Sequence, residues 1–131
     1  MRRIEVVAAV MIQGGRVFAA QRDEGGEVGL KWEFPGGKIE AGETHREALE
    51  RELREELSIV AVAGDSLMTV SHAYRDFQLT MYCYLADILS GSVLLLEHID
   101  SRWLASDEID GVDWAPADRE VAAKVRELLR R

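Results

Sequence analysis

The segment that decides the fold and the chemistry is Gly37-Lys-Ile-Glu-Ala-Gly-Glu43, followed by Arg51-Glu-Leu-Arg-Glu-Glu-Leu-Ser-Ile59. The pattern predicts a glycine turn, a carboxylate and then a helix with clustered acidic residues. The spacing of Glu52, Glu55 and Glu56 places all three side chains on one face of that helix. Such like charges repel by roughly a few tenths of a kcal/mol per pair. A divalent cation would offset the repulsion, and oxygen ligands favour Mg²⁺, with Mn²⁺ as a substitute.

Composition and charge limit the partners of this chain. Its 131 residues are enough for a domain with its own core, and we expect residues 1–131 to form one domain. The net charge of −8 argues against a nucleic-acid polymer or a membrane as partner, because such binding needs clustered Lys and Arg. A small phosphorylated substrate is compatible, since bound divalent ions reverse the local field. Both a monomer and a homodimer fit these observations.

The N-terminal segment and the single cysteine indicate the compartment. Val6–Ile12 is apolar, like part of a signal peptide, but Glu5 interrupts the apolar region and the run passes directly into Gly14-Gly15. This pattern favours a β-hairpin, and no apolar run is long enough to span a bilayer. Cys83 has no partner for an internal disulfide and lies in an apolar run, so we expect a small core side chain in a cytoplasmic protein.

The hydrophobic patterns predict the order of the elements. We expect strands at 3–12, 16–22, 59–70, 77–89 and 101–104, a short extended segment at 32–34 that ends in a turn at Pro35-Gly36-Gly37, and a short apolar piece at 93–97. Thr44 and Glu47 form a capping box for a helix over 44–57, and a last helix begins near Pro116. Strands that precede and separate two helices predict an α+β fold, a mixed β-sheet flanked by helices in an α/β/α sandwich.

The acidic helix has a simpler explanation, a solvated face whose Glu–Arg pairs contribute little to stability. Two features favour a site instead. The Pro35-Gly36-Gly37 segment frees backbone groups that can contact an ion or a phosphate. Glu43 lies eight residues before Arg51, which is far enough to need a folded loop between them.

The spacing of these residues resembles the Nudix box. The matching positions are Gly37, Glu43 and Arg51-Glu-Leu-x-Glu-Glu-x-x-Ile59, and further similarity to the MutT-like branch lies in Trp32–Gly37, Glu97 and Ala115–Asp118. Within that branch the chain is most similar to bacterial CTP pyrophosphohydrolases and 8-oxo-dGTP diphosphatases. The resemblance covers most of the chain and implies the Nudix fold.

The resemblance also implies an activity. The expected reaction is Mg²⁺-dependent hydrolysis of nucleoside triphosphates to the monophosphate and pyrophosphate. It would serve nucleotide-pool sanitation, and so DNA repair, or act on (d)CTP. Two alternatives stay open: hydrolysis of another nucleoside diphosphate-X compound, and a non-catalytic Nudix module that binds nucleotide.

The resemblance implies roles for the charged residues as well. The metal ligands would be the carboxylates of Glu52, Glu55, Glu56 and Glu97 and the carbonyl of Gly36. Either Glu52 or Glu97 would be the general base. The structural positions of the motif would be Gly37, Glu43 and Arg51, with the Glu43–Arg51 ion pair fixing the loop onto the helix.

The substrate residues implied by the resemblance are Arg22 and Lys38 for the phosphates, the segment Glu33, Phe34, Pro35 and Gly36, and Asp118 for the base edge. Phe34 would either stack on a nucleobase or pack as a core aromatic. Asp118 would either read the base or cap the following helix. When ionised it would accept a hydrogen bond from an exocyclic amine such as cytosine N4, whereas a protonated pair would suit an oxidised purine. The three histidines are scattered, and we assign no metal or catalytic role to His45, His72 or His98.

Two positions depart from the family pattern. Ser58 stands where the box has Gly, and a left-handed backbone there would cost Ser about 1 kcal/mol relative to Gly. Lys31 is an extra residue between Leu30 and Trp32 and would shift the loop before the motif. Neither departure removes a chemical group from the expected site.

Overall fold

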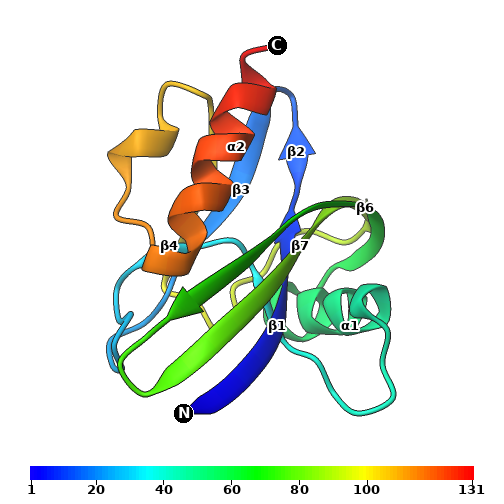
Figure 1. The fold of residues 1–131 in the computed structure, drawn as a ribbon. Helices are drawn as coiled ribbons and strands as arrows, with labels where there is room; N and C mark the ends of the chain where they lie inside the picture. The colour runs from blue at the N-terminus through cyan, green and yellow to red at the C-terminus, as the bar shows by residue number, and fades with distance from the viewer.

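All 131 residues are described in the computed structural model, whose elements run from Arg2 to Leu129 (Figure 1). The strands are β1 (Arg2–Val10), β2 (Ile12–Gln13), β3 (Arg16–Gln21), β4 (Trp32–Glu33), β5 (Gly36–Lys38), β6 (Val60–Ala73), β7 (Phe77–Ser90) and β8 (Asp100–Leu104). The helices are α1 (His45–Leu57) and α2 (Arg119–Leu129), with 3₁₀ turns η1 (Ile109–Gly111) and η2 (Pro116–Asp118).

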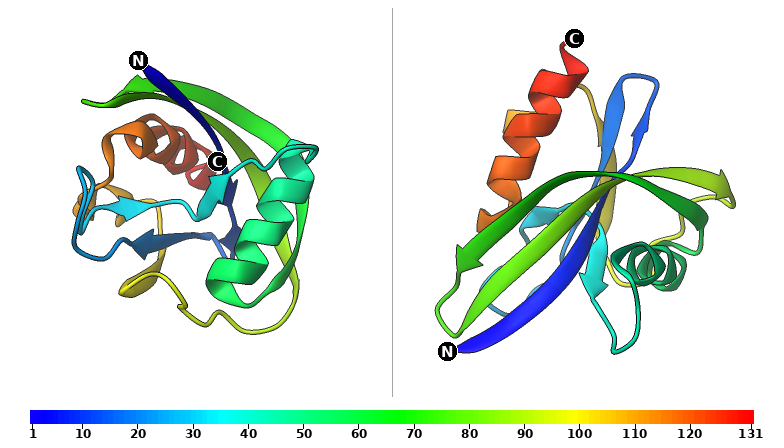
Figure 2. Two further views of the ribbon diagram at one scale, coloured as in Figure 1. Left: turned by 90° about the horizontal axis from the view of Figure 1, so that it is seen from below. Right: turned by 45° about the vertical axis from the view of Figure 1, so that its right-hand side comes forward.

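The strands form two sheets. The larger strands make a sheet of order β5-β1-β7-β6, in which β1 is parallel to β7 and the other pairs are antiparallel. In the second sheet β3 pairs antiparallel with β2, β4 and β8. The helices α1 and α2 lie on opposite sides of the first sheet (Figure 2). This arrangement confirms the predicted α+β fold with a mixed sheet flanked by helices.

The core has two halves because side chains alternate across β1. Ala8 and Val10 belong to a buried cluster that contains the apolar face of α2, including Val121. Val7 and Ala9 point the other way, into a cluster with the buried leucines of α1. Burial raises the pKa of the Cys83 thiol to about 12, as expected for the core side chain predicted.

Both ends of α1 agree with the sequence pattern. The Thr44 hydroxyl accepts from the Glu47 N–H at 3.1 Å, and the Glu47 carboxylate accepts from the Thr44 N–H at 2.9 Å, so the capping box is confirmed. At the other end Ser58 has φ 56° and ψ 36°, which is the left-handed conformation. The family's Gly position therefore does require a left-handed backbone in this chain.

The turn predicted at Gly36-Gly37 is wrong, because these residues form β5 and pair with β1. A Cβ at Gly36 would overlap the carbonyl of Val7. Only glycine lets the two backbones approach this closely. The predicted strand 3–12 is interrupted at Met11, and β6 continues to Ala73 rather than ending at 70.

The segment 93–97 is not a regular strand and lies along the end of α1. The Leu94 N–H donates to the Leu57 carbonyl at 2.9 Å, and the Leu96 N–H donates to the Glu56 carbonyl at 3.1 Å. The last carbonyls of a helix have no partner inside it. These two hydrogen bonds satisfy the carbonyls of Glu56 and Leu57, and they bring the residues after Leu96 beside the acidic helix.

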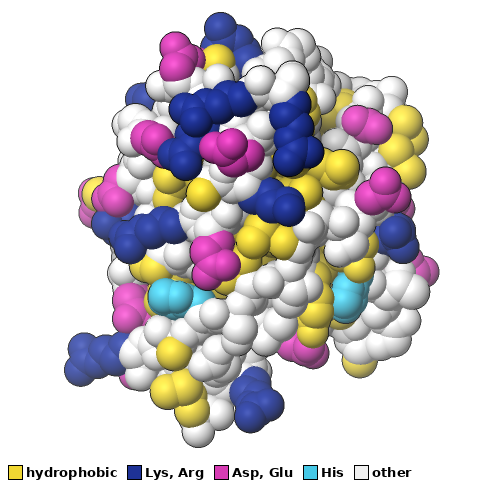
Figure 3. Space-filling view, turned by 45° about the horizontal axis from the view of Figure 1, so that its top comes forward, with side chains coloured by type: hydrophobic (Ala, Val, Ile, Leu, Met, Phe, Trp, Pro, Cys, Tyr) yellow, Lys and Arg dark blue, Asp and Glu magenta, His cyan; other side chains and the backbone are white.

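The surface carries charges of both signs. Figure 3 shows basic and acidic side chains interspersed on one face, with the apolar surface divided into small areas. Ion pairs such as Arg126–Asp110, at 2.7 Å, account for part of this mixture. Neither helix has the length and apolar character needed to cross a bilayer.

Candidate active site

An acidic cleft of about 870 Å³ opens between β5, α1 and the segment before β8. The carboxylates that line it are those of Asp23, Glu33, Glu40, Glu52, Glu56 and Glu97. Its wall also contains the cationic side chains of Arg22 and Lys38. Because the carboxylates outnumber the cations, a bound cation would lower the electrostatic energy of this cleft.

Arg51 fixes the loop that follows β5 onto α1. Its guanidinium donates to both oxygens of Glu43, at 2.7 and 2.9 Å, and to the Lys38 carbonyl at 3.0 Å. It also donates to Glu52 at 2.9 Å and to Glu55 at 3.2 Å. The hydrogen bonds to Arg51 lower the pKa of Glu43 to about 2, and they raise the pKa of Arg51. The structural ion pair predicted for these two residues is therefore present and stays charged at neutral pH.

Gly37 sets the position of Glu52. A Cβ at Gly37 would overlap the Glu52 carboxylate, which shows that this carboxylate lies directly against the backbone of β5. Arg51 holds the same carboxylate through a hydrogen bond. Gly36, whose carbonyl was predicted as a metal ligand, and Gly37 both line the cleft.

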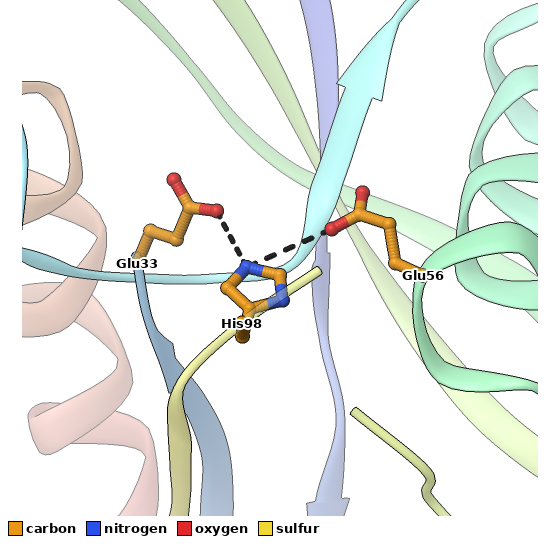
Figure 4. A group of neighbouring side chains, drawn as sticks. All are labelled: Glu33, Glu56 and His98. Carbon is orange, nitrogen blue, oxygen red and sulfur yellow. Dashed lines mark hydrogen bonds and ion pairs between the residues drawn. The ribbon is translucent and has the colours of Figure 1, made fainter. Parts of the chain in front are cut away.

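Glu56 is the most buried carboxylate of α1, with 5% of the residue exposed. Burial, followed by the charges of Glu33 and Glu52, raises its pKa to about 9. His98 Nε2 lies 2.9 Å from Glu33 Oε2 and 3.7 Å from Glu56 Oε2 (Figure 4). Burying an anion among anions is costly unless a cation compensates it. The donor set of this cleft therefore fits a divalent metal ion.

The structure separates the carboxylates predicted to hold the metal. Glu52, Glu56 and Glu97 line the cleft. Glu55 does not line it; its side chain is 54% exposed and bonded to Arg51. Glu97 is exposed and makes no ion pair or side-chain hydrogen bond. Glu97 is therefore free to turn toward a ligand in the cleft, whereas Glu55 is held outside it.

A second, more apolar pocket of about 400 Å³ adjoins the cleft. Its apolar wall comes from β1, β7 and the β6–β7 turn, with Ile4, Val6, Tyr74, Phe77, Leu79 and Met81 among its residues. The pocket and the cleft share one wall, formed by Arg22, Glu33, Gly36, Gly37 and Lys38. A ligand with an apolar end and an anionic end can therefore occupy both cavities at once.

Asp118 is the only carboxyl group that is fully buried at this pocket. Burial, followed by the charge of Glu33, raises its pKa well above the ordinary value. Its Oδ1 accepts from the Phe34 N–H at 3.0 Å, and it makes no capping hydrogen bond to α2. The capping interpretation of Asp118 is therefore wrong, and its remaining oxygen is available at the pocket.

Phe34 and Pro35 contribute differently from Asp118. The ring of Phe34 stacks on Trp114, with centroids 4.7 Å apart, and only 3% of the residue is exposed. Its core role is thus clear, although the residue also lines the pocket. Pro35 is buried and lines neither cavity; its carbonyl accepts from the Ala9 N–H at 2.8 Å.

Sequence reasoning missed several residues of the two cavities. It assigned no role to His98, which the structure places between Glu33 and Glu56. It also gave no pocket role to Tyr74 or Phe77, which flank the turn of the β6–β7 hairpin. A single aromatic residue or histidine in a strand-like pattern does not indicate whether its side chain will line a cavity. The one available signal was adjacency, since His98 directly follows the predicted Glu97.

Comparison with known proteins identifies the family to which this chain belongs. The model of the NUDIX domain family matches residues 6–124. The chain is 35% identical over 118 residues to the CTP pyrophosphohydrolase of Escherichia coli, across 90% of this chain and 87% of that protein. It is 32% identical over 122 residues to the 8-oxo-dGTP diphosphatase of Haemophilus influenzae, across 92% of this chain and 90% of that protein.

A solved structure gives the same result. The solution structure of the DNA mismatch repair protein MutT, a Nudix hydrolase from methicillin-resistant Staphylococcus aureus, superposes with a TM-score of 0.78. That pair is 36% identical, and the match covers 98% of this chain and 99% of the other. The chain therefore belongs to the Nudix family, and it is a Nudix hydrolase of the MutT-like branch. The predicted family, fold and enzyme class are confirmed.

Proposed function

We propose that this protein hydrolyses nucleoside triphosphates to the monophosphate and pyrophosphate with Mg²⁺ as cofactor. The observation that carries the proposal is the wall shared by the acidic cleft and the apolar pocket. A nucleotide has a flat, largely apolar base and an anionic phosphate chain, so it fits two adjoining cavities of opposite polarity. The activities named for the relatives, CTP pyrophosphohydrolase and 8-oxo-dGTP diphosphatase, support the same reaction.

The residues of the cleft divide the work of phosphate hydrolysis. Glu52, Glu56 and Glu97, with the Gly36 carbonyl, would hold the divalent ion, which when bound supplies charge neutralisation at the phosphate oxygens and a lowered pKa for water. Lys38 and Arg22 lie on the shared wall, where a phosphate chain entering from the pocket would meet them. Glu52 or Glu97 accepts the proton of the attacking water.

The base preference depends on the proton carried by Asp118. The raised pKa of Asp118 favours the neutral acid, and one of its oxygens already accepts a hydrogen bond from the Phe34 N–H. The neutral acid donates through its other oxygen to an acceptor on an oxidised purine, whereas the anion accepts from cytosine N4. An oxidised guanine triphosphate is therefore the first substrate to test, and CTP or dCTP is the second.

The direct test is a turnover screen with Mg²⁺ over canonical, oxidised and methylated triphosphates, with sugar nucleotides and dinucleotide polyphosphates alongside. We expect monophosphate and pyrophosphate in equal amounts from at least one triphosphate. Turnover restricted to sugar nucleotides or dinucleotides would favour the other nucleoside diphosphate-X reaction. Tight binding of a triphosphate without any product would instead make the protein a nucleotide-binding module.

The general base is identified by comparing Glu52→Gln with Glu97→Gln. Both variants should bind Mn²⁺ more weakly, because each removes a proposed ligand. The variant that removes the base should also lose kcat at saturating Mn²⁺, whereas the other should recover most of its kcat there. Glu40→Gln is the matched control, because Glu40 lies at the exposed rim of the same cleft.

A further inference from the structure

We infer that His98 is a positioning residue. Its imidazole N–H links two sides of the cleft: Glu56, on the side proposed to bind metal, and Glu33, on the side proposed to bind substrate. The inference rests on the proposed function, since it assigns a role inside the same site. The His98 side chain is 4% exposed, so it contributes little as a surface group. It lies between two carboxylates that come from different elements, Glu33 of β4 and Glu56 of α1 (Figure 4).

The contacts of Glu33 extend this connection to the shared wall. His98 Nε2 lies 2.9 Å from Glu33 Oε2, and Arg22 donates to Glu33 Oε1 at 3.1 Å. On the other side His98 Nε2 lies 3.7 Å from Glu56 Oε2. The line Arg22–Glu33–His98–Glu56 therefore runs from a candidate phosphate-binding side chain to the most buried carboxylate of the cleft. A shift of any of these four side chains would change the distance between the bound phosphate chain and the Glu56 carboxylate.

The environment of the second ring nitrogen decides how His98 acts. His98 Nδ1 is buried and has no hydrogen-bond partner. A neutral imidazole carries one N–H and one bare nitrogen, and a buried N–H without an acceptor is costly. The proton therefore belongs on Nε2, where Glu33 accepts it. A metal-bound histidine normally donates its other N–H to an acceptor, and Nδ1 has none. The geometry thus points to a hydrogen-bond donor rather than to a metal ligand.

The backbone on each side of His98 holds the ring in place. Before it, the Leu96 N–H donates to the Glu56 carbonyl of α1 at 3.1 Å. After it, the Ile99 N–H donates to the Gln21 carbonyl of β3 at 3.0 Å. The two residues between these bonds, Glu97 and His98, are therefore held between α1, which carries Glu56, and β3, which pairs with the strand that carries Glu33. A hydrogen-bond donor on a segment held at both ends keeps the carboxylates of Glu33 and Glu56 in a fixed arrangement.

The test uses two substitutions that place an amide donor at different points. His98→Gln puts its N–H₂ near the position of Nε2, whereas His98→Asn puts it near Nδ1. We expect His98→Gln to keep kcat within about threefold, and His98→Asn to lose about 10- to 100-fold, the usual cost of removing a group that orients metal ligands. The KM for nucleotide should change less than kcat in both variants. His45→Asn is the matched control, because His45 packs on Tyr82 outside both cavities.

Metal binding gives a second readout that needs no turnover. Titration with Mn²⁺ followed by electron paramagnetic resonance should show weaker binding by about tenfold in His98→Asn and near wild-type binding in His98→Gln. Circular dichroism melts confirm that each variant is folded. Equal kcat and equal Mn²⁺ affinity in the two variants would overturn the inference. So would nitrogen coupling from His98 in the pulsed spectrum of bound Mn²⁺, because it would make His98 a ligand. If the wild type hydrolyses no triphosphate, the proposed function fails while the Mn²⁺ comparison still decides the role of His98.

Discussion

The acidic cleft and the apolar pocket share a wall, yet they are built in different ways. Most of the cleft comes from residues 33–56, with Arg22 and Asp23 added from the segment after β3 and residues 96–98 from a later loop. The pocket collects residues from β1, the loop before β4, the β4–β5 segment, the β6–β7 hairpin and the segment around η2. The acidic part is thus encoded mostly by nearby residues, whereas the apolar pocket exists only when distant segments meet. Substitutions in the cleft and in the pocket therefore test the two parts separately.

The largest effect should follow from removing the charge of Glu56. Glu56→Gln keeps the shape of the side chain but deletes an anion from the cleft, so we expect kcat to fall by on the order of 10³-fold. Without metal the variant should melt at the same temperature or higher, because a neutral amide replaces a desolvated carboxyl. Glu50→Gln on the same helix is the control, since an amide there can still accept from the Ala63 N–H. Wild-type turnover in Glu56→Gln would show that hydrolysis does not need the charge of Glu56, and it would contradict a catalytic role for the cleft.

The local network of the cleft can be broken at Arg51. Lysine keeps the charge but cannot donate to Glu43 through two parallel bonds and reach Glu52 and the Lys38 carbonyl as well. We expect Arg51→Lys to lose about 10- to 100-fold in kcat and about 2 kcal/mol of unfolding free energy. Arg54→Lys is the control, because Arg54 is exposed and makes no ion pair. Kinetics and urea denaturation measure the two losses, and equal behaviour of both variants would contradict the network.

The pocket is tested separately through Asp118. Asp118→Asn keeps the acceptor for the Phe34 N–H but replaces the second oxygen with a fixed donor. We expect the ratio of kcat/KM between cytidine and oxidised purine triphosphates to change by about tenfold or more, while the higher of the two kcat values changes little. The steady-state constants for both nucleotides measure this. An equal fall for both substrates would mean that Asp118 is structural.

The pH dependence of stability reports how strongly ionisation of Glu56 destabilises the folded protein when no metal is bound. The pKa of Glu56 in the folded protein is raised to about 9 from an ordinary value of 4.5. The folded state binds the proton more tightly than the unfolded state, so this contribution is full below pH 4.5 and is lost as the pH rises toward 9. Melting temperatures in EDTA should therefore fall across this window, and the fall should be smaller in Glu56→Gln. A saturating concentration of Mg²⁺ should also reduce it.

The smallest expected effect lies at the end of α1. Ser58 has a left-handed backbone, and glycine adopts this conformation without steric cost. We expect Ser58→Gly to raise the unfolding free energy by up to about 1 kcal/mol with no change in kcat. Urea denaturation and steady-state kinetics are sufficient to check it. A change in kcat would show that Ser58 influences the cleft as well as the helix end.

The predictions that succeeded depend on contacts between near neighbours in the sequence. The capping box of Thr44 and Glu47 is set by residues within one helical turn. The Glu43–Arg51 pair joins residues only eight positions apart. Such features follow from the geometry of one element and need no knowledge of the rest of the chain.

The misses have the opposite character. Gly36 and Gly37 look like a turn in isolation, and they become β5 only because β1 lies close enough to pair with them. Glu55 shares a helix face with Glu52 and Glu56, but only the tertiary structure shows that it bonds to Arg51 and does not line the cleft. Asp118 looks like a cap for the next helix, but its hydrogen-bond donor is the Phe34 N–H, 84 positions earlier.

The amino-acid sequence by itself determined the family, the acidic helix and the local network that holds its loop, because short-range spacing sets which side chains share a helix face. Tertiary structure alone decided which carboxylates enter the cleft, what lines the pocket and where His98 lies. These outcomes depend on contacts such as His98 with Glu33, 65 residues apart. Contacts of that range are set by how sheets and helices pack, and no local pattern records them.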